Sequence, residues 1–238
     1  MYGLADRSRL SDRIRWIKLL RERHPMISSA DNRQTPGHFD EAAASWDDNT
    51  HRRALTEAIA RAIRDVLPLS RKWRVLEYGC GTGTLSFLLA SAVREVVAAD
   101  ASPGMIEQVR RKLAMCPDCR MTPLLLDLTS EPVPSDTFDL VITAMALHHV
   151  EDVAQLLSTL RGMLVRGGWL VVADLCAEDG SFHEPMKVPH NGFAPGALAD
   201  VARRSLGEAD CQWRIVHRVQ KNDRGYDVFL LAAHQIMA

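Results

Sequence analysis

The sequence predicts an α/β fold in which a mainly parallel, doubly wound sheet carries helices on both faces. From Trp73 onward, short apolar and β-branched runs alternate with amphipathic helical patterns, which is typical of parallel sheets. A glycine-rich turn joins the first strand to the first helix, and the next two strands each end in a carboxylate. We therefore expect strands near residues 73–78, 95–99, 121–126, 138–143 and 168–174. Helices are expected near residues 84–92, 103–114, 151–164 and 196–206.

Further elements precede and follow this alternating region. A helical pattern with an apolar stripe runs from Trp46 to Leu67, and Pro68 ends it. Near the C-terminus, residues 212–219 and 226–233 are two strand patterns separated by a turn-rich segment. We expect these two strands to form an antiparallel pair at one end of the sheet.

The N-terminal segment has a different character. Residues 1–24 are locally basic, and apolar residues recur there at helical spacing. Residues 24–37 are rich in polar and breaker residues and indicate a linker. We expect residues 1–37 to be a helical extension that acts as a lid or a homodimer contact, and residues 38–238 to form the main domain. A basic amphipathic helix could instead bind a membrane or RNA.

Composition limits the classes of partner and compartment. The formal net charge is −1, which argues against a nucleic-acid partner bound through bulk charge. No apolar run approaches the ~20 residues of a membrane span, and the charged N-terminus does not resemble an export signal. The odd cysteine count of 5 favours a reducing, cytoplasmic setting over a disulfide framework. Cys116 and Cys119 are expected to be free thiols, because a zinc site would need two further ligands nearby.

The turn after the first strand has the spacing E-x-G-x-G-x-G, from Glu77 through Gly79 and Gly81 to Gly83. It differs from the dinucleotide-binding pattern G-x-G-x-x-G, since Thr84 stands where the third glycine would be. Glycines allow positive φ angles and let a ligand approach main-chain atoms. The turn therefore predicts a ligand-binding loop, the alternative being a tight turn without a ligand.

Asp100 ends the second predicted strand, beside this loop. In sheets of this topology, such a carboxylate accepts hydrogen bonds from ribose hydroxyls. Dinucleotide-binding enzymes bind ribose with the same kind of carboxylate, so Asp100 alone does not indicate which cofactor is bound. The alternative role of Asp100 is to cap the helix that starts near Pro103.

Two further motifs are more specific. Residues 138–152 combine F-D-L-V with L-H-H-V-x-D, and residues 160–170 contain a helix end, a glycine turn and a fifth strand. Together with the glycine loop, they resemble class I S-adenosylmethionine-dependent methyltransferases, in particular the small-molecule branch that includes ubiquinone and menaquinone biosynthesis enzymes. The resemblance covers roughly residues 38–235, and Arg166 stands where these relatives usually have proline.

This resemblance implies a Rossmann-like, doubly wound, seven-stranded sheet with an antiparallel last strand. It implies S-adenosylmethionine as cofactor, S-adenosylhomocysteine as product, and in-line methyl transfer to an O, N, S or C atom of a small metabolite. Glu77 and the glycine loop would hold the methionine part, and Asp100 the ribose. Asp127 and the Leu128 amide would meet the adenine, unless Asp127 only faces solvent. The implied cofactor-binding residues are Glu77, Gly79, Cys80, Gly81, Gly83, Asp100, Ala101, Met105, Asp127, Leu128, Thr143 and Ala144.

Histidines supply the candidates for acceptor chemistry. His148 and His149 follow the fourth strand, near the expected methyl group, and a neutral imidazole is a natural base near neutral pH. We expect His148 to act as base or substrate contact. His149 either contacts substrate or packs against a neighbouring loop.

The long loop of residues 175–196 predicts an acceptor pocket, because it combines aromatic, methionine and polar side chains. Its candidate substrate contacts are His183, Phe193 and His190. His190 is expected either to take part in catalysis or to structure the loop. A metal bound by His183 and His190 would lack a third ligand, so no metal site is predicted. Trp46 is expected to cover the sulfonium with its ring face, with core packing as the alternative.

Other functions stay open at this point. The N-P-P-Y type tetrapeptide of nucleic-acid and amide methyltransferases is absent after the fourth strand, where the sequence reads T-A-M-A-L-H. The alternatives are an RNA or protein methyltransferase that docks through the basic N-terminal helix, an enzyme that cyclises the methionine part of the cofactor, and a non-catalytic cofactor-binding protein. The acceptor and its nucleophilic atom do not follow from the sequence.

Overall fold

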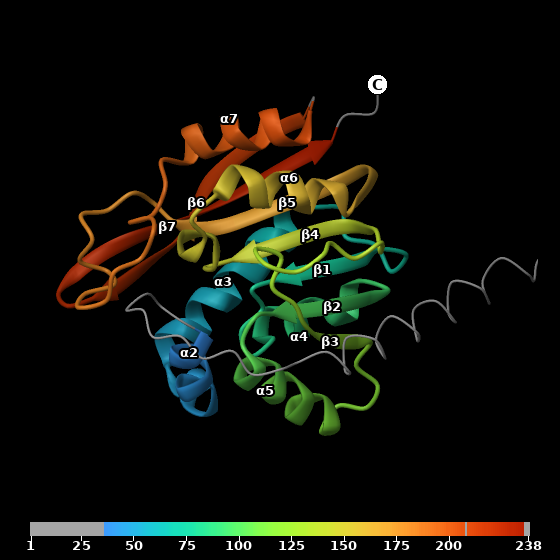
Figure 1. Ribbon diagram of the computed structural model, residues 1–238, viewed down its shortest axis with the longest axis horizontal. Coiled ribbons are helices and arrows are strands. Elements are labelled where there is room, and N and C mark those ends of the chain that lie inside the picture. Colours follow the sequence, from blue (N-terminus) through green and yellow to red (C-terminus); the bar gives the residue numbers. More distant parts are fainter. Residues whose placement is uncertain (1–35, 208, 236–238) are drawn as a thin grey trace, which may run out of the picture. The chain divides into compact units, whose positions relative to one another are not determined.

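The computed structural model describes residues 36–207 and 209–235 (Figure 1). The predicted basic helix of residues 1–24 and nearly all of the predicted linker lie outside these residues. Within the described chain, seven strands form one sheet in the order β3-β2-β1-β4-β5-β7-β6. The strands are β1 (Arg74–Tyr78), β2 (Glu95–Asp100), β3 (Met121–Leu125), β4 (Phe138–Ala144), β5 (Leu164–Leu175), β6 (Ala209–Lys221) and β7 (Arg224–Gln235).

The sheet is parallel except for one strand. Strands β1 to β5 run parallel to one another, whereas β7 lies antiparallel between β5 and β6. The predicted Rossmann-like sheet with an antiparallel last strand is therefore confirmed. The strand order reverses at β1, which pairs with β2 on one side and β4 on the other. Doubly wound sheets bind ligands at the carboxyl edge of such a switch point.

Helices cover both faces of the sheet, as predicted. The α-helices are α2 (Pro36–Ala42), α3 (Thr50–Val66), α4 (Thr84–Leu89), α5 (Pro103–Ala114), α6 (Val153–Gly162) and α7 (Pro195–Leu206), and the 3₁₀ turns are η1 (Ala43–Asp48), η2 (Ala90–Ala92) and η3 (Leu147–His149). Successive strand residues point to opposite faces. Leu76 and Val141 accordingly pack in a core with α6 and α7, whereas Val75 and Leu140 pack in a second core with α3 and α4.

The predicted continuous helix from Trp46 to Leu67 is interrupted in the structure. Asn49 has an extended backbone, and its Oδ1 accepts hydrogen bonds from the N–H groups of His51 and Arg52 at 3.0 and 3.1 Å. Such a side chain caps a new helix, so α3 begins at Thr50. Trp46 therefore lies in the preceding 3₁₀ turn η1 rather than in the helix.

The structure also corrects the predicted junction between helix 151–164 and strand 168–174. Helix α6 ends at Gly162, and β5 already begins at Leu164, which pairs with Phe138 of β4. The register between β4 and β5 shifts just after this pair, and Gly167 has a φ of 74°. A proline at position 166 would remove a backbone donor from this segment. Arg166 lies within β5 and keeps its backbone N–H.

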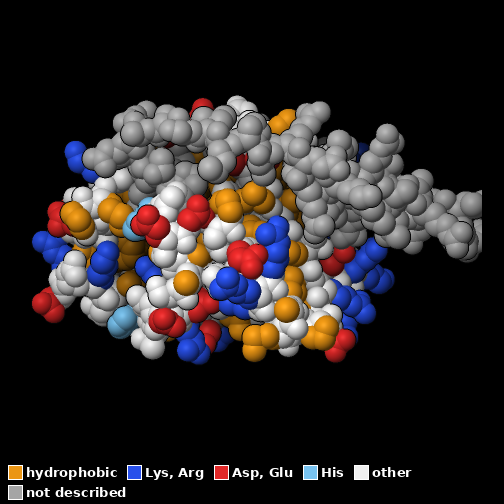
Figure 2. Space-filling model, turned by 60° about the horizontal axis from the view of Figure 1, so that its bottom comes forward, with side chains coloured by type: hydrophobic (Ala, Val, Ile, Leu, Met, Phe, Trp, Pro, Cys, Tyr) orange, Lys and Arg blue, Asp and Glu red, His pale blue; other side chains and the backbone are white. Residues whose placement is uncertain are grey.

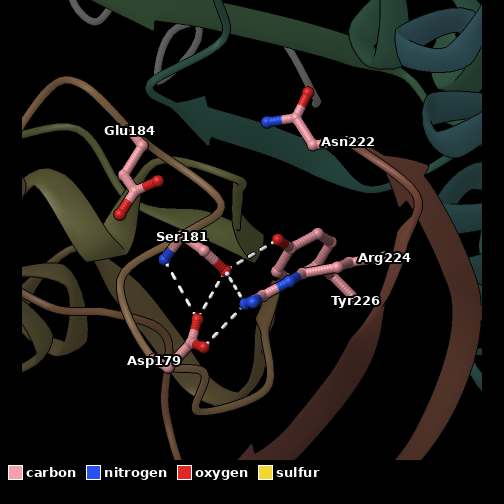
Figure 3. Close-up of a pocket in the computed structure, with 6 residues that line it drawn as sticks. All are labelled: Asp179, Ser181, Glu184, Asn222, Arg224 and Tyr226. Atoms are coloured by element: carbon pink, nitrogen blue, oxygen red, sulfur yellow. Dashed lines mark hydrogen bonds and ion pairs between the residues drawn. The ribbon is translucent and has the colours of Figure 1, made fainter.

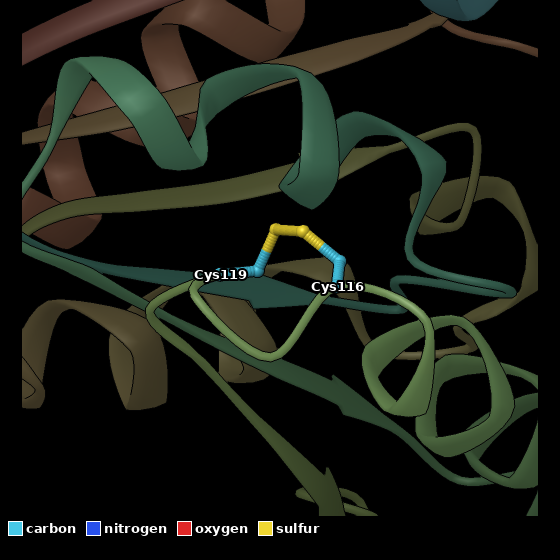
Figure 4. The surroundings of a disulfide bond; sticks show 2 residues. All are labelled: Cys116 and Cys119. Carbon is cyan, nitrogen blue, oxygen red and sulfur yellow. A yellow bond between two sulfur atoms is a disulfide. The ribbon is translucent and has the colours of Figure 1, made fainter.

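Cys116 and Cys119 form a disulfide bond rather than two free thiols (Figure 4). They lie between α5 and β3, in a tight turn where the Cys119 N–H donates to the Cys116 carbonyl at 3.0 Å. Their Cα atoms are 5.5 Å apart, which suits a disulfide. The expectation of free thiols at this pair is therefore wrong. Cys80, Cys176 and Cys211 are free.

The described surface carries charges of both signs. Lys and Arg side chains lie among Asp and Glu side chains on the face shown in Figure 2, in keeping with a net charge of −1. Among the helices of the described residues, none combines the length and the apolar character that a membrane span requires.

Candidate cofactor and acceptor site

The glycine loop follows β1 at the carboxyl edge of the sheet. Gly79, Gly81 and Gly83 all have positive φ angles, of 73°, 54° and 76°. The Gly79 N–H donates to the Ala99 carbonyl at 2.8 Å, which fixes the loop against β2. A Cβ atom at position 79 would lie 2.5 Å from the Ala146 Cβ, so the loop also touches the segment that follows β4. Conformation and space both require glycine at this position.

Asp100 ends β2 and binds backbone groups on two sides. Its Oδ2 accepts from the Gly81 N–H at 2.7 Å, and its Oδ1 accepts from the Ser102 N–H at 2.9 Å. Burial raises the pKa of Asp100, against the lowering effect of these two bonds. The cap of α5 is Ser102, whose Oγ accepts from the Met105 N–H at 3.1 Å. Asp100 is therefore a support of the glycine loop and not the helix cap.

Glu77 lies on β1 beneath this loop and is only 2% exposed. Its carboxyl accepts a hydrogen bond from the Ser86 hydroxyl of α4. Burial raises the pKa of Glu77 to about 8, so the carboxyl is mostly protonated at neutral pH. A cationic group placed nearby would favour the ionised form.

Asp47 of η1 ties the segment before the sheet to the glycine loop. It accepts from the hydroxyls of Thr82 and Thr84 at 2.7 and 3.1 Å. It also pairs with the Lys112 ammonium of α5 at 2.5 Å. Burial alone would raise the pKa of Asp47, but its hydrogen bonds with these partners bring that pKa below its ordinary value.

Asp40 of α2 makes a second link of this kind. Its Oδ1 accepts from the Gly104 N–H at 2.8 Å and from the Ser102 hydroxyl. A Cβ at position 104 would lie 2.8 Å from the Asp40 Cα, so α2 and α5 are in close contact. Sequence reasoning missed Asp40 and Asp47 as organising residues. The sequence does place the dipeptide Phe39-Asp40 ahead of the helical pattern that runs to Leu67.

The carboxylate of Asp127, just after β3, is used by its own turn. Its Oδ1 accepts from the Thr129 N–H at 2.9 Å and from the Thr129 hydroxyl at 2.6 Å, and Oδ2 accepts from the Ser130 hydroxyl at 2.9 Å. The Leu128 N–H donates to the Tyr78 hydroxyl at 3.2 Å. An adenine ring would have to compete for these groups, so the adenine-binding roles of Asp127 and Leu128 stay predictions.

The remaining residues implied for the cofactor lie just after β2, on α5 and at the end of β4. Ala101 is exposed and Met105 is buried on α5. Thr143 is buried, and its hydroxyl has no hydrogen-bond partner in the described chain, while the neighbouring Ala144 is partly buried. An unpaired buried hydroxyl is costly, so Thr143 is a position at which a bound ligand could satisfy a buried polar group.

Trp46 and Phe39 connect the glycine loop to the histidines. Trp46 Nε1 lies 3.8 Å from the position of a Cβ on Gly81. The Phe39 ring contacts the Trp46 ring edge-on, at 5.9 Å between centroids, and the His149 ring at 5.3 Å. The Arg52 guanidinium lies over the Trp46 ring at 3.8 Å and occupies part of it. Trp46 thus lies near the loop, and its contact with a sulfonium stays a prediction.

Three histidines meet beyond the carboxyl ends of β4 and β5. His148 and His149 belong to η3, and His183 belongs to the loop between β5 and α7. The ring centroid of His148 lies 4.1 Å from that of His149 and 4.7 Å from that of His183. The ring centroids of His149 and His183 are 5.7 Å apart. The structure therefore brings together three of the residues predicted for acceptor chemistry. We call these three residues the histidine cluster.

Asp174, which sequence reasoning missed, orients the first of these rings. This fully buried carboxylate lies 2.6 Å from His148 Nδ1 and also accepts from the Leu175 N–H at 2.7 Å. A carboxylate can only accept, so a neutral His148 ring carries its proton on Nδ1 and offers Nε2. Asp174 lies near the end of β5, as Glu77 and Asp100 do on β1 and β2, so the same strand-end rule could have found it.

The other two histidines are held neutral by their surroundings. Burial is the main cause that lowers the pKa of His149 to about 2 and the pKa of His183 to about 4, and the neighbouring His148 contributes to both shifts. The Nδ1 atoms of His149 and His183 are buried and have no partner in the described chain. The histidine cluster thus offers neutral imidazole nitrogens in a largely buried setting.

His190 and Phe193 lie outside the histidine cluster. The His190 N–H donates to the His148 carbonyl at 3.2 Å, whereas its Nε2 lies 3.3 Å from the Glu151 carbonyl. The Phe193 ring is 5.2 Å from the His190 ring and packs against the core that contains α6 and α7. These contacts favour the loop-structuring role of His190 over the catalytic one.

A pocket of about 230 Å³ lies between the loop after β5 and the β6–β7 turn (Figure 3). Its walls are Asp179, Ser181, Glu184, Asn222, Arg224 and Tyr226. Arg224 pairs with Asp179 at 2.7 Å, and the hydroxyls of Ser181 and Tyr226 are 2.8 Å apart. The polar groups of this pocket largely satisfy one another, so they brace the loop that carries His183.

Comparison with known proteins agrees with the motifs. Residues 75–168 match the model of a methyltransferase-domain family. An uncharacterized methyltransferase of Mycobacterium tuberculosis is 33% identical over 127 residues, which cover 53% of this chain and 59% of that protein. The demethylmenaquinone methyltransferase of Clavibacter sepedonicus is 34% identical over 159 residues, 61% of either chain. The chain thus spans 59% to 61% of the length of these two curated relatives.

Solved structures share the fold. A Haloferax volcanii methyltransferase, solved in complex with its activator Trm112, superposes with a TM-score of 0.70 at 16% identity, covering 88% of this chain and 100% of that one. The DhpI–SAM–HEP complex superposes with a TM-score of 0.65 at 19% identity and the same coverage, 88% and 100%. The resemblance to class I S-adenosylmethionine-dependent methyltransferases is therefore confirmed, and residues 75–168 are the part that matches the methyltransferase-domain model.

Proposed function

We propose that this chain transfers a methyl group from S-adenosylmethionine to a small-molecule acceptor. The observation that carries the proposal is the meeting of two groups of residues at one edge of the sheet. The glycine loop touches the segment after β4 at Ala146, and the histidine cluster begins two residues further on. A donor in the loop and an acceptor at the histidines would therefore be neighbours.

The cofactor would lie over the glycine loop. Asp100 would bind the ribose hydroxyls and Glu77 would face the methionine ammonium, which suits a carboxyl that a nearby cation converts to its ionised form. The positive φ angles of the loop glycines expose main-chain atoms to such a ligand. Bound S-adenosylmethionine supplies a methyl group that is already activated for displacement.

His148 would remove the proton of the acceptor. Its Nε2 takes the proton as the acceptor atom forms its new bond to carbon, and Asp174 stabilises the resulting imidazolium. The buried surroundings of the cluster exclude water, and holding both partners in line can supply ~7–11 kcal/mol of the barrier. The pair of ring and carboxylate is thus suited to an acceptor hydroxyl, thiol or acidic carbon.

A small metabolite fits this site better than a polymer. Aromatic rings of Phe39 and Phe182 contact the histidine cluster, as in pockets for small molecules. The cradle tetrapeptide of nucleic-acid and amide methyltransferases is absent. The named activity of the Clavibacter sepedonicus relative makes quinols and phenols the first acceptors to test.

The test combines binding with product analysis. Calorimetric titration should show binding of S-adenosylmethionine but not of NAD. Incubation with methyl-deuterated cofactor and a panel of quinols, phenols and a metabolite extract should yield S-adenosylhomocysteine and one acceptor that gains a labelled methyl group. Binding of NAD alone, or release of a cyclised methionine fragment without any labelled acceptor, would refute methyl transfer.

The roles of the N-terminal segment stay predictions, because residues 1–24 lie outside the described chain. A variant that lacks these residues separates the alternatives. Altered turnover of the small molecule would support a lid or dimer contact, whereas loss of salt-dependent RNA binding would support the RNA enzyme.

A further inference from the structure

We propose that the histidine cluster, His148, His149 and His183, is a binding site for a divalent transition-metal ion, with Zn²⁺ as the best-suited occupant. Each residue offers one ring nitrogen, and the three ligand atoms all lie within 4.8 Å of one another. Sequence reasoning paired His183 with His190 and found no third ligand. The folded chain instead brings His183 to the two histidines of η3.

The distances require a modest closure of the site. Zinc–nitrogen bonds are ~2.0–2.1 Å long, so two nitrogens on one ion lie ~3–4 Å apart. Ligand nitrogens that are as much as 4.8 Å apart must therefore approach one another by about one ångström to bind the same ion. His183 can supply this movement, because it lies in a loop without regular secondary structure, while His148 and His149 are neighbours in η3.

Unpaired nitrogens are the second observation. His149 Nδ1 and His183 Nδ1 are buried, and neither has a hydrogen-bond partner in the part of the chain that the structure describes. Buried polar atoms are nearly always paired, and an unpaired one costs ~1–3 kcal/mol. A bound metal ion would give these nitrogens a partner.

Asp174 provides the third observation. Metal-binding histidines commonly hydrogen-bond a carboxylate through the ring nitrogen that does not bind the metal. The 2.6 Å contact between Asp174 and His148 Nδ1 has this arrangement and leaves Nε2 for the ion. The Lys221 ammonium lies 4.8 Å from the ring centroid of Phe182, the residue before His183, and so brings positive charge near the cluster. The negative charge of the Asp174 carboxylate offsets it.

Three protein ligands leave a fourth position of zinc open, as in catalytic zinc sites. This consequence rests on the proposed function: an acceptor hydroxyl or thiol in that position would release its proton to solvent more readily as it binds, and the ion would replace His148 as the activating group. Metal binding itself does not depend on the activity.

The experiment uses the full chain with Cys116→Ser and Cys119→Ser, so that reduction of the disulfide cannot create a thiolate site. Calorimetric titration with Zn²⁺ should give one ion per chain, and Co²⁺ should give the visible absorption of a tetrahedral, nitrogen-ligated ion. Asp174→Asn should weaken Zn²⁺ binding by ~10–100-fold. His183→Gln should weaken it more, whereas His51→Gln, at an exposed position on α3, should leave it unchanged.

The proposal is overturned if the parent chain binds no stoichiometric ion, or if a folded His183→Gln variant binds Zn²⁺ as the parent does. Should His183→Gln fail to fold, the Co²⁺ spectrum of the parent decides, and a spectrum without tetrahedral nitrogen ligation overturns the proposal. S-adenosylmethionine binding is measured on the same samples. Cofactor binding without metal binding refutes only the metal site, and metal binding without methyl transfer refutes only the proposed function.

Discussion

The two sides of the candidate site differ in how their polar groups are satisfied. On the cofactor side, Asp100 accepts from two backbone N–H groups and Asp47 binds two hydroxyls and the Lys112 ammonium. On the acceptor side, the Nδ1 atoms of His149 and His183 are buried without partners in the described chain. The carboxylates that support the glycine loop already have their partners, whereas the histidine cluster leaves buried groups that a ligand would satisfy.

This difference separates preorganisation from binding. Polar groups that already bind one another hold a loop in shape, and a ligand must add to their hydrogen bonds or replace them. Buried nitrogens without partners store an unfavourable free energy that a proton donor or a metal ion removes. Substitutions on the cofactor side should therefore change loop shape and cofactor affinity together, whereas those on the acceptor side should change chemistry and leave cofactor affinity intact.

The largest effect is expected from Asp100→Ala. The substitution removes both backbone contacts of the carboxylate and the predicted ribose acceptor, each hydrogen bond to a charged group being worth ~1.5–3 kcal/mol. Affinity for S-adenosylmethionine should fall by ~100-fold or more. Calorimetry measures it, with Asp65→Ala, at an exposed position on α3, as the control variant. Equal losses in both variants would show that loop support by Asp100 has no special role.

His148→Gln should lower kcat by ~10²–10⁴-fold, because the general base is lost. The dissociation constant of S-adenosylmethionine should not change, since His148 contacts Asp174 and the other histidines rather than the glycine loop. Steady-state turnover assays measure kcat, and calorimetry on the same preparation measures the dissociation constant. An unchanged kcat would mean that the acceptor arrives already ionised and needs no base.

Glu77 should make the stability of the cofactor-free chain depend on pH. Its pKa is raised from 4.5 to about 8 by burial, so the native state holds a proton that the unfolded chain loses above pH 4.5. The free energy of unfolding should therefore fall as pH rises from about 4.5 to about 8, by on the order of a few kcal/mol, and level off beyond. Urea denaturation across this range measures the change. Glu77→Gln should flatten this part of the profile, and an equally steep decline in that variant would assign the effect to other groups.

The smallest effect is expected from Trp46→Leu. If the ring faces the sulfonium, the substitution removes a cation–π contact of ~0.5–1 kcal/mol, or a roughly two- to fivefold loss of affinity. The loss should be greater for the charged S-adenosylmethionine than for the neutral S-adenosylhomocysteine. Equal losses for both ligands would assign Trp46 to packing against Phe39 and Arg52 instead.

Much of the cofactor side could be predicted from the sequence. The spacing of the glycines reflects the backbone conformation of one turn, and the strand-end carboxylates reflect the order of strands and helices. Both features can be recognised within a short stretch of sequence. Gly79, Gly81 and Gly83 have the positive φ angles, and Asp100 lies beside them. Asp174 obeys the same rule, because it closes the strand expected near residues 168–174 and lies one residue before the end of β5.

The rest depends on contacts between distant segments. The approach of His183 to His148 follows from the path of an irregular loop, for which the sequence carries no periodic signal. The Asp47 contacts depend on the break at Asn49, where one side-chain cap outweighs a helical pattern of hydrophobic residues. The pairing of Cys116 with Cys119 depends on the shape of a single turn.

In the proposed reaction, the contact between positions 79 and 146 couples the donor half of the site to the acceptor half. The absent side chain at Gly79 is the space that Ala146 occupies, and Ala146 immediately precedes η3. Any methyl group added at position 79 would push the start of η3 outward and carry both of its imidazoles with it. The alignment of the two reactants thus depends on one hydrogen atom in place of a side chain.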